Sequence, residues 1–461
     1  MTPATALPLA DEPAIETLPT AACHSFGGDD DLPAKGARVR IAGFPKQDHE
    51  EMARLLDLHG YLPTAFAGNA DAVLVPEATA EILEEARRSG RRVLVPEQLR
   101  PEAMPSLRRS PLEITNDSVR ILDVTLPRRA VASAHVPAAD RFAHLCLDAS
   151  FLAAARAVAI AAESGLPCAL EGDTAVAKTT AVLWVAHLLR QDAIRLNLNG
   201  QSDTGELVGR FVPAADGTSG ATWRFQEGIV PEAMRHGRWV VLDEMNLAEP
   251  QVLERLNPVL EYPPTLVLSE NGGTRFGTGG DVAVAESFRI FATMNPAEYS
   301  GRSVLSPAFR DRFCLWNVLS PPGEGEYRAL LDRLVHGVHP EFVLDGVIWK
   351  APDREPVYPQ LASEPGIDEL LGSIASFHCA VAAASGGEGG AELGRSRRER
   401  YVFTRRTLLA MMSLCATRVA RGMHAAEAAV EALETVYVSR AQPGPDRQAM
   451  RTALRTVDIG R

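Results

Sequence analysis

The sequence predicts an α/β protein in which buried parallel strands end in polar side chains. Three short apolar stretches, residues 166–170, 239–242 and 288–294, support this prediction. Each has the length of a buried strand, and acidic or amide side chains follow it at once. Carboxyl ends of parallel strands meet at one edge of a sheet, so we expect these polar side chains to share one ligand site.

The composition is that of an ordinary globular protein. A chain of 461 residues is long enough for about two to four domains. Its 59 acidic and 47 basic residues give a net charge of -12, which argues against broad non-specific binding of nucleic acid. The six cysteines are scattered without a C-x-x-C pair, so we expect buried thiols in a reducing compartment.

Targeting and membrane segments are not expected. The first 31 residues lack the basic start and apolar core of a signal peptide. No apolar run is expected to reach the roughly 18 to 20 residues that span a bilayer. The sequence therefore predicts a cytoplasmic protein with no membrane partner.

Five segments are expected along the chain. Residues 1–36, rich in alanine, proline and acidic residues, predict a disordered lead. Residues 37–100 predict a small α/β domain, and the proline-dense segment 101–138 predicts a linker. Residues 139–320 predict the large domain that holds the ligand site. Residues 321–461 predict a mostly helical domain.

The small domain follows a strand-helix alternation. Apolar runs at 39–44, 72–75 and 92–95 predict strands, and amphipathic stretches between them predict helices. This order predicts a small parallel sheet.

The strand at 166–170 is followed by a candidate phosphate loop. Its residues are Gly172, Asp173, Thr174, Ala175, Val176, Ala177, Lys178, Thr179 and Thr180. In such a loop, backbone N–H groups and a helix N-terminus hold the phosphates, the lysine reaches the β and γ oxygens, and the hydroxyl of Thr179 binds Mg²⁺. Alanines stand at positions 175 and 177, where glycine is usual. Alanine resists positive φ, so the loop is plausible if Ala177 has already entered the helix.

The second strand delivers two carboxylates about 65 residues later. Asp243 is expected in the shell of the Mg²⁺ ion, and Glu244 is expected to orient and deprotonate the attacking water. The pair in isolation could be a solvated strand end, but a preceding phosphate loop favours a site that hydrolyses a nucleoside triphosphate.

Three further polar residues follow. Asn295 ends the third strand and is expected to bond the γ-phosphate or the water, although it could also cap a turn before Pro296. Arg310 and Arg312 lie on a short segment after it. Either is a candidate arginine finger for the site of a neighbouring subunit, and either could be an ordinary solvated arginine.

These motifs and the segments around them resemble the AAA+ ATPases of the dynein-related, midasin and MoxR branch. The resemblance runs from Glu171 to Phe313, with its most specific parts at residues 204–213, 225–234, 243–250 and 253–261. It implies a P-loop AAA+ three-layer core with a small helical lid, and ATP with Mg²⁺ as cofactors.

The resemblance also implies features outside the core motifs. Two inserts, near 204–225 and as a hairpin near 262–288, would touch substrate. A lid arginine would sense the nucleotide, with Arg406 as the best match and Arg405 as the alternative. The protein would work as a homo-oligomeric ring, expected to be a hexamer, on a protein partner that could be a separate von Willebrand A-domain protein.

The small domain resembles a BRCT domain. Gly43-Phe44, Gly60 and the run at 86–97 carry this resemblance, while Ala42 stands where a phosphopeptide pocket has a serine or threonine. A BRCT-like docking domain is therefore expected without phosphopeptide binding.

Three functions remain open at this stage. The favoured one is an ATP-hydrolysing chaperone or activase that remodels a protein or complex. The second is a motor subunit of a nucleic-acid processing, restriction or repair system, for which the arginines of 395–406 are the one basic stretch. The third is a nucleotide-binding scaffold slowed by its two loop alanines.

Overall fold

The computed structural model describes residues 37–42, 108–174, 176–213, 223–296, 305–344, 347–386, 393–394 and 401–456, with scattered positions from 52 to 94. The predicted lead 1–36, Gly43-Phe44, Gly60, Ala175 and the arginines at 395–400 lie outside the described residues. The chain forms two compact units, residues 1–103 and 104–461.

The first unit contains a parallel sheet. Its strands are β1 (Arg38–Ile41), β2 (Leu62–Thr64), β3 (Ala72–Leu74) and β4 (Arg92–Leu94), in the order β2-β1-β3-β4. The side chains of Val39, Leu56 and Leu74 are fully buried in its core. The predicted small parallel sheet is confirmed for these residues, and β2 is a strand that the pattern did not indicate. The BRCT resemblance stays a prediction.

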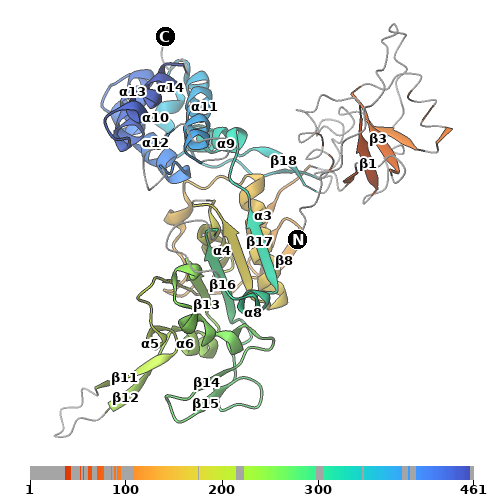
Figure 1. Cartoon of the computed structure of the whole chain (residues 1–461), viewed down its shortest axis with the longest axis vertical. Helices are drawn as coiled ribbons and strands as arrows, with labels where there is room; N and C mark the ends of the chain where they lie inside the picture. Colours follow the sequence, from red (N-terminus) through yellow and green to blue (C-terminus); the bar gives the residue numbers. More distant parts are fainter. Residues whose placement is uncertain are drawn as a thin grey trace, which may run out of the picture. The chain divides into compact units, whose positions relative to one another are not determined.

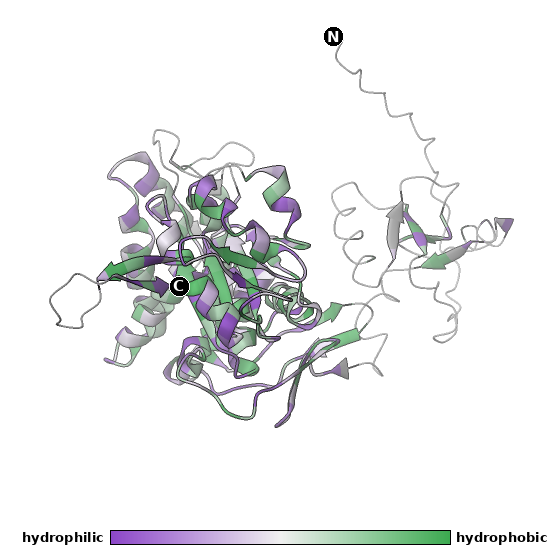
Figure 2. Cartoon of the chain, turned by 90° about the horizontal axis from the view of Figure 1, so that it is seen from below, coloured by the Kyte–Doolittle hydropathy of each residue, from purple (hydrophilic) through white to green (hydrophobic). Residues whose placement is uncertain are grey.

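The second unit is built around a five-stranded parallel sheet. Its strands are β9 (Cys168–Gly172), β10 (Ala193–Asn197), β13 (Trp239–Asp243), β16 (Arg289–Met294) and β17 (Leu315–Leu319), in the order β10-β13-β16-β9-β17. The three apolar stretches of the sequence are the central strands β9, β13 and β16. Figure 2 shows the apolar residues concentrated in this sheet.

Helices cover both faces of the sheet. Trp239 and Val241 face a core with α3 (Ala149–Ser164) and α4 (Lys178–Leu188), whereas their neighbours Val240 and Leu242 face the opposite core. That second core contains α6 (Ile229–His236), η8 (Met245–Leu247) and α7 (Pro250–Glu254). The strands are therefore apolar on both faces, as buried parallel strands require. The predicted α/β three-layer core is confirmed (Figure 1).

The prediction of a linker over 101–138 is wrong for much of that segment. Strands β6 (Leu112–Ile114), β7 (Ser118–Ile121) and β8 (Val124–Pro127) form an antiparallel sheet. The buried side chains of Val119, Ile121 and Leu126 lie in the same core as α3. Leu122, in the turn between β7 and β8, has a φ of 52°. The sequence Leu122-Asp123 does not predict this conformation, because tight hairpin turns usually contain glycine or asparagine.

The start of the helical domain also differs from the prediction. Strands β18 (Glu341–Leu344) and β19 (Val347–Lys350) are antiparallel, and β19 pairs with β5 (Arg108–Arg109). Trp349 and Ala351 are buried in the α3 and α4 core. Residues 341–344 and 347–351 therefore belong with the large domain, whereas the other described residues after 321 are mostly helical.

The lid has a core of its own. Its helices are α9 (Glu324–Val335), α10 (Pro359–Ala362), α11 (Ile367–Gly386), α12 (Arg405–Val419), α13 (Ala425–Val436), η10 (Val438–Arg440) and α14 (Pro445–Thr456). Phe377 and Tyr437 are among its fully buried side chains. The predicted helical character is confirmed for the described residues.

Helix α11 is long and apolar enough to cross a membrane by length and composition, with a 19-residue stretch of mean hydropathy 1.3. The prediction that no apolar run reaches this length is wrong for that stretch. Core helices of globular domains also reach this length and hydropathy, and Leu371, Ile374 and Phe377 of α11 are buried in the lid core. The helix is thus weak evidence for a membrane span.

Two hairpins and several short helices complete the second unit. The hairpins are β11 (Gly209–Pro213) with β12 (Trp223–Glu227), and β14 (Leu266–Leu268) with β15 (Thr274–Phe276). They occupy the two expected inserts. The short helices are η7 (Ala139–Phe142), α5 (Thr204–Leu207), η9 (Asn257–Leu260) and α8 (Pro307–Asp311).

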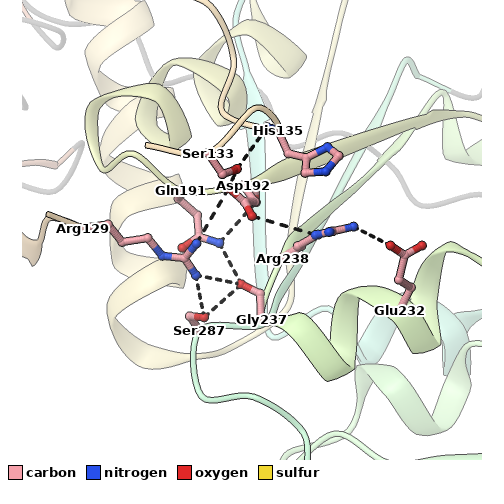
Figure 3. Close-up of polar contacts among 9 residues, drawn as sticks. All are labelled: Arg129, Ser133, His135, Gln191, Asp192, Glu232, Gly237, Arg238 and Ser287. Carbon is pink, nitrogen blue, oxygen red and sulfur yellow. Dashed lines mark hydrogen bonds and ion pairs between the residues drawn. The ribbon is translucent and has the colours of Figure 1, made fainter. Parts of the chain in front are cut away.

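A polar cluster ties the amino ends of three strands together. Asp192, Arg238 and Ser287 stand just before β10, β13 and β16 (Figure 3). The carbonyl of Gly237 accepts hydrogen bonds from Arg129 at 3.2 Å, from Gln191 at 2.8 Å and from Ser287 at 2.9 Å. This cluster fixes the sheet at the edge opposite to the polar strand ends described next.

Candidate active site

The phosphate loop connects β9 to α4. The ammonium group of Lys178, the first residue of α4, donates to the carbonyls of Gly172 at 2.7 Å and Asp173 at 2.6 Å. Among the described residues, no side chain caps the N-terminus of α4. The N-terminus of a helix that follows a strand and a loop is a common position for phosphate binding.

Other loop residues shape the turn. A Cβ at Gly172 would lie 2.8 Å from the carbonyl oxygen of Leu319, so only glycine fits there. Val176 is buried, whereas Thr174 and Thr180 are half-buried. Ala175 lies outside the described residues.

The condition that Ala177 has already entered the helix is not met. Ala177 is the N-cap of α4, at a φ of 65° and a ψ of 20°. This left-handed conformation is the one that glycine adopts without cost, and alanine is strained in it by about 1 to 2 kcal/mol. Ala177 therefore adopts the backbone conformation of a glycine although it carries a side chain.

Asp243 and Thr179 form an all-oxygen ligand set. The hydroxyl of Thr179 donates to Oδ1 of Asp243 at 2.6 Å. Mg²⁺ prefers a few oxygen ligands of this kind and fills its remaining positions with water and phosphate oxygens. The two residues thus fit the predicted metal ion.

Sequence reasoning missed two partners of Asp243. Thr293 on β16 donates to Oδ1, and Arg195 on β10 donates to Oδ2 through Nε at 2.7 Å and through a second guanidinium nitrogen. Each precedes a polar strand-end residue by two positions, so strand alternation places it on the same face as Asn295 or Asn197. Alternation could have placed both residues on the face of the sheet that bears the site, but it could not have identified Asp243 as their partner.

The charge of Asp243 is stabilised by these partners. Burial on its own would raise the pKa of Asp243, but hydrogen bonds from Thr179, Thr293 and Arg195 and the positive charge of Arg195 lower it below its ordinary value. The carboxylate is therefore ionised at neutral pH and able to ligate a cation.

Asn295 joins the loop lysine to Glu244. Its side-chain oxygen accepts from Lys178 at 2.8 Å, and its Nδ2 donates to the two carboxylate oxygens of Glu244 at 3.0 and 3.1 Å. The amide of Asn246 donates to the backbone carbonyl of Asn295 at 2.8 Å. Glu244 itself has a φ of 55°, a strained conformation of the kind found at functional sites.

The two candidate finger arginines have different surroundings on and next to α8. Arg310 lies over the ring of Trp316, 4.3 Å from its centroid, and pairs with Glu171 at 3.5 Å. Arg312 donates to the carbonyl of Ala308 at 2.7 Å and lies 3.9 Å from Glu261. Arg310 thus contacts β9, the strand before the phosphate loop, whereas Arg312 contacts Ala308 and Glu261.

The lid arginines also separate. Arg405, at the start of α12, donates to Asp148 at 2.7 Å, and both residues are buried. Asp148 also caps α3 by accepting from the N–H of Phe151 at 2.8 Å. Burial raises the pKa of Asp148, although the charge of Arg405 opposes this shift. Arg406 is exposed, and its side chain makes no hydrogen bond or ion pair with the described residues.

Comparison with known families agrees with this architecture. Residues 167–313 match the model described as the AAA domain of the dynein-related subfamily. This segment contains β9, α4, β13, β16 and α8, and so includes every site residue except those of the lid. The second unit therefore carries an AAA domain, and ATP-binding ATPases are the class to which that domain belongs.

Curated relatives match over the same part of the chain. A midasin of Dictyostelium discoideum is 36% identical over 31% of this chain, and a midasin of Giardia intestinalis is 33% identical over 40%. The denitrification regulatory protein NirQ of Pseudomonas aeruginosa is 28% identical over 36% of this chain. The matched regions cover 2% and 4% of the midasins and 60% of NirQ.

A solved structure of a presumed ATPase from Cytophaga hutchinsonii covers 70% of this chain and 93% of its own, at 18% identity and a TM-score of 0.32. A likeness of that size says nothing about function. The assignment of the AAA domain rests on the family match and on the sheet described above.

Proposed function

We propose that this protein hydrolyses ATP and uses the energy to remodel or activate a protein partner as a homo-oligomeric ring. The main support for ATP hydrolysis is the chain of hydrogen bonds from Lys178 through Asn295 to Glu244. The side-chain amide of Asn295 contacts both of the other residues. Lys178 would hold the γ-phosphate, and Glu244 would take the proton of the attacking water.

Each residue of the site would have a separate role in ATP hydrolysis. Lys178 would exchange its loop carbonyls for phosphate oxygens, and Asn295 would hold the water or the γ-phosphate beside Glu244. Glu244 would orient the water and accept its proton. Thr179 and Asp243 would hold Mg²⁺, which when bound would neutralise charge at the β and γ oxygens.

The substitution Glu244→Gln tests this assignment. It keeps the shape of the side chain but removes the base, so we expect ATP turnover to fall by about 100-fold or more while nucleotide binding is retained. Equal turnover in both proteins would show that Glu244 is not the base. Wild-type protein that binds ATP but turns it over no faster than the variant would favour the scaffold function.

A ring is supported by the direction of the arginines. Arg312 contacts none of Lys178, Asp243 and Glu244 in the described part of the chain, so we propose that it serves the site of a neighbouring subunit. Arg310 is the second candidate, but a finger role would require it to leave Glu171 and Trp316. ATPase activity per subunit should fall when the protein is diluted to monomers. Activity that stays constant on dilution would contradict the shared site.

A protein is the proposed substrate because the relative NirQ is described as a regulatory protein and because the net charge is -12. Arg406, exposed at the start of the lid helix α12, is the proposed nucleotide sensor, since Arg405 is committed to Asp148. The first unit is proposed to dock the partner. ATPase activity stimulated by DNA, with steep loss in salt, would favour the nucleic-acid motor instead.

A further inference from the structure

Arg195 is the one arginine of the described residues that contacts the proposed metal ligand Asp243. It lies on β10, the edge strand of the central sheet, and its side chain is 46% exposed. The side chain of Asp243 is only 5% exposed. A half-exposed arginine thus supplies the counter-charge for a buried carboxylate.

The two oxygens of Asp243 have different partners. Oδ1 accepts from the hydroxyls of Thr179 and Thr293, whereas Oδ2 accepts twice from Arg195. Thr179 and Asp243 would hold the metal ion through oxygen atoms, and Asp243 would then share its carboxylate between that ion and the guanidinium group, whose Nε lies 2.7 Å from Oδ2.

Two cations held by one carboxylate repel each other. The repulsion is strongest where water is excluded, and Asp243 is buried. The positive charge that Arg195 holds against Oδ2 would therefore weaken any bond from the same carboxylate to a divalent cation. Arg195 can yield because it lies at the sheet edge with nearly half of its side chain already in solvent.

We propose that Arg195 competes with Mg²⁺ for Asp243: it neutralises the carboxylate while the site is empty and is displaced when the metal enters with nucleotide. This inference rests on the proposed nucleotide site and adds a regulator of its metal affinity. Arg195 is therefore an antagonist of metal binding, and its removal should tighten the site.

A purely positioning role makes the opposite prediction. If Arg195 served to hold the Asp243 carboxylate toward the metal, its loss would weaken metal binding. The contacts disfavour that role, because the hydroxyl of Thr293, itself 1% exposed, already fixes Oδ1 from the neighbouring strand β16. The sign of the change in metal affinity thus separates the two roles.

The test compares Arg195→Gln with wild type in the full-length chain. A fluorescent ADP analogue is bound in EDTA, and Mg²⁺ is then titrated to find the concentration that gives half of the fluorescence change. We expect this concentration to fall about tenfold in R195Q, which corresponds to about 1.4 kcal/mol. R195K keeps the charge but loses one of the two bonds to Oδ2, and should fall between R195Q and wild type.

A matched control uses Arg235. Arg235 lies on α6, its side chain is 40% exposed and pairs with Glu227 at 2.6 Å, and it contacts neither Thr179 nor Asp243 in the described part of the chain. R235Q should leave the Mg²⁺ dependence unchanged. A similar shift in R235Q and R195Q would overturn the proposal, because a general loss of positive charge would then explain both.

A second titration does not need nucleotide. Free Mn²⁺, followed by its electron paramagnetic resonance signal, should bind more tightly to nucleotide-free R195Q than to wild type. Unchanged or weaker binding of Mg²⁺ and Mn²⁺ in R195Q overturns the proposal. Failure of the wild-type protein to bind the ADP analogue would contradict the proposed function instead. In that case the Mn²⁺ comparison alone decides the role of Arg195.

Discussion

Replacing Ala177 by glycine should relieve strain in the phosphate loop. Ala177 has a φ of 65°, and a left-handed alanine costs about 1 to 2 kcal/mol. Glycine removes that cost but adds flexibility to the unfolded chain, worth about 0.4 to 1 kcal/mol. It also removes a half-buried methyl group, worth a few tenths of a kcal/mol. The net expectation is a change in the free energy of unfolding between zero and about 1 kcal/mol in favour of the variant.

A matched substitution isolates the strain. Ala153 is exposed in the middle of α3, where glycine is expected to cost about 0.5 to 1 kcal/mol. The flexibility term is common to both variants, so A177G should be about 1 to 2 kcal/mol more stable than A153G. Calorimetric unfolding of the nucleotide-free protein measures the difference, which should appear as a midpoint higher by a few degrees. Equal losses in the two variants would refute the left-handed conformation of Ala177.

Two further predictions concern stability. Burial lowers the pKa of His378 to about 4. Between pH 4 and the ordinary histidine pKa of about 6.5, the unfolded chain therefore binds more protons than the folded chain. The contribution of His378 to the free energy of unfolding should be fully present above about pH 6.5 and fall by about 3 kcal/mol toward pH 4. H378Q should flatten this part of the unfolding profile while its amide keeps a bond to the hydroxyl of Tyr437, and a profile as steep as that of wild type would contradict the assignment. G237A should cost about 2 kcal/mol or more in thermal unfolding, because its Cβ would lie 2.1 Å from Oγ of Ser287 at a φ of 66°. Adding S287A should recover part of that loss, and no recovery would exclude the clash as its cause.

The sequence predicts those parts of the molecule whose evidence is local. Asp243, Glu244 and Asn295 end or directly follow apolar strands, and Lys178 follows the loop after a third strand, so their convergence at one sheet edge follows from strand direction and the loop motif. The structure brings all four together. The assignment of their catalytic roles stays a proposal.

Features that depend on strand register or backbone conformation were not predictable in the same way. Arg195 reaches Asp243 because Asn197 lies opposite Asp243 across β10 and β13, and nothing in either strand specifies that register. The β7–β8 turn at Leu122 carries no glycine or asparagine. Ala177 adopts a conformation that its residue type disfavours, so reasoning from propensity gave the wrong answer there.

The buried pair of Arg405 and Asp148 should make the contact between the lid helix α12 and α3 less sensitive to salt than an exposed ion pair would be. Dissolved ions screen charges that water reaches, and the side chains of this pair are 10% and 2% exposed. The pair of Arg310 and Glu171 beside α8 differs, because the arginine side chain is 56% exposed. Raising the ionic strength should therefore loosen α8, which precedes the candidate finger Arg312, while the contact between α12 and α3 keeps its strength.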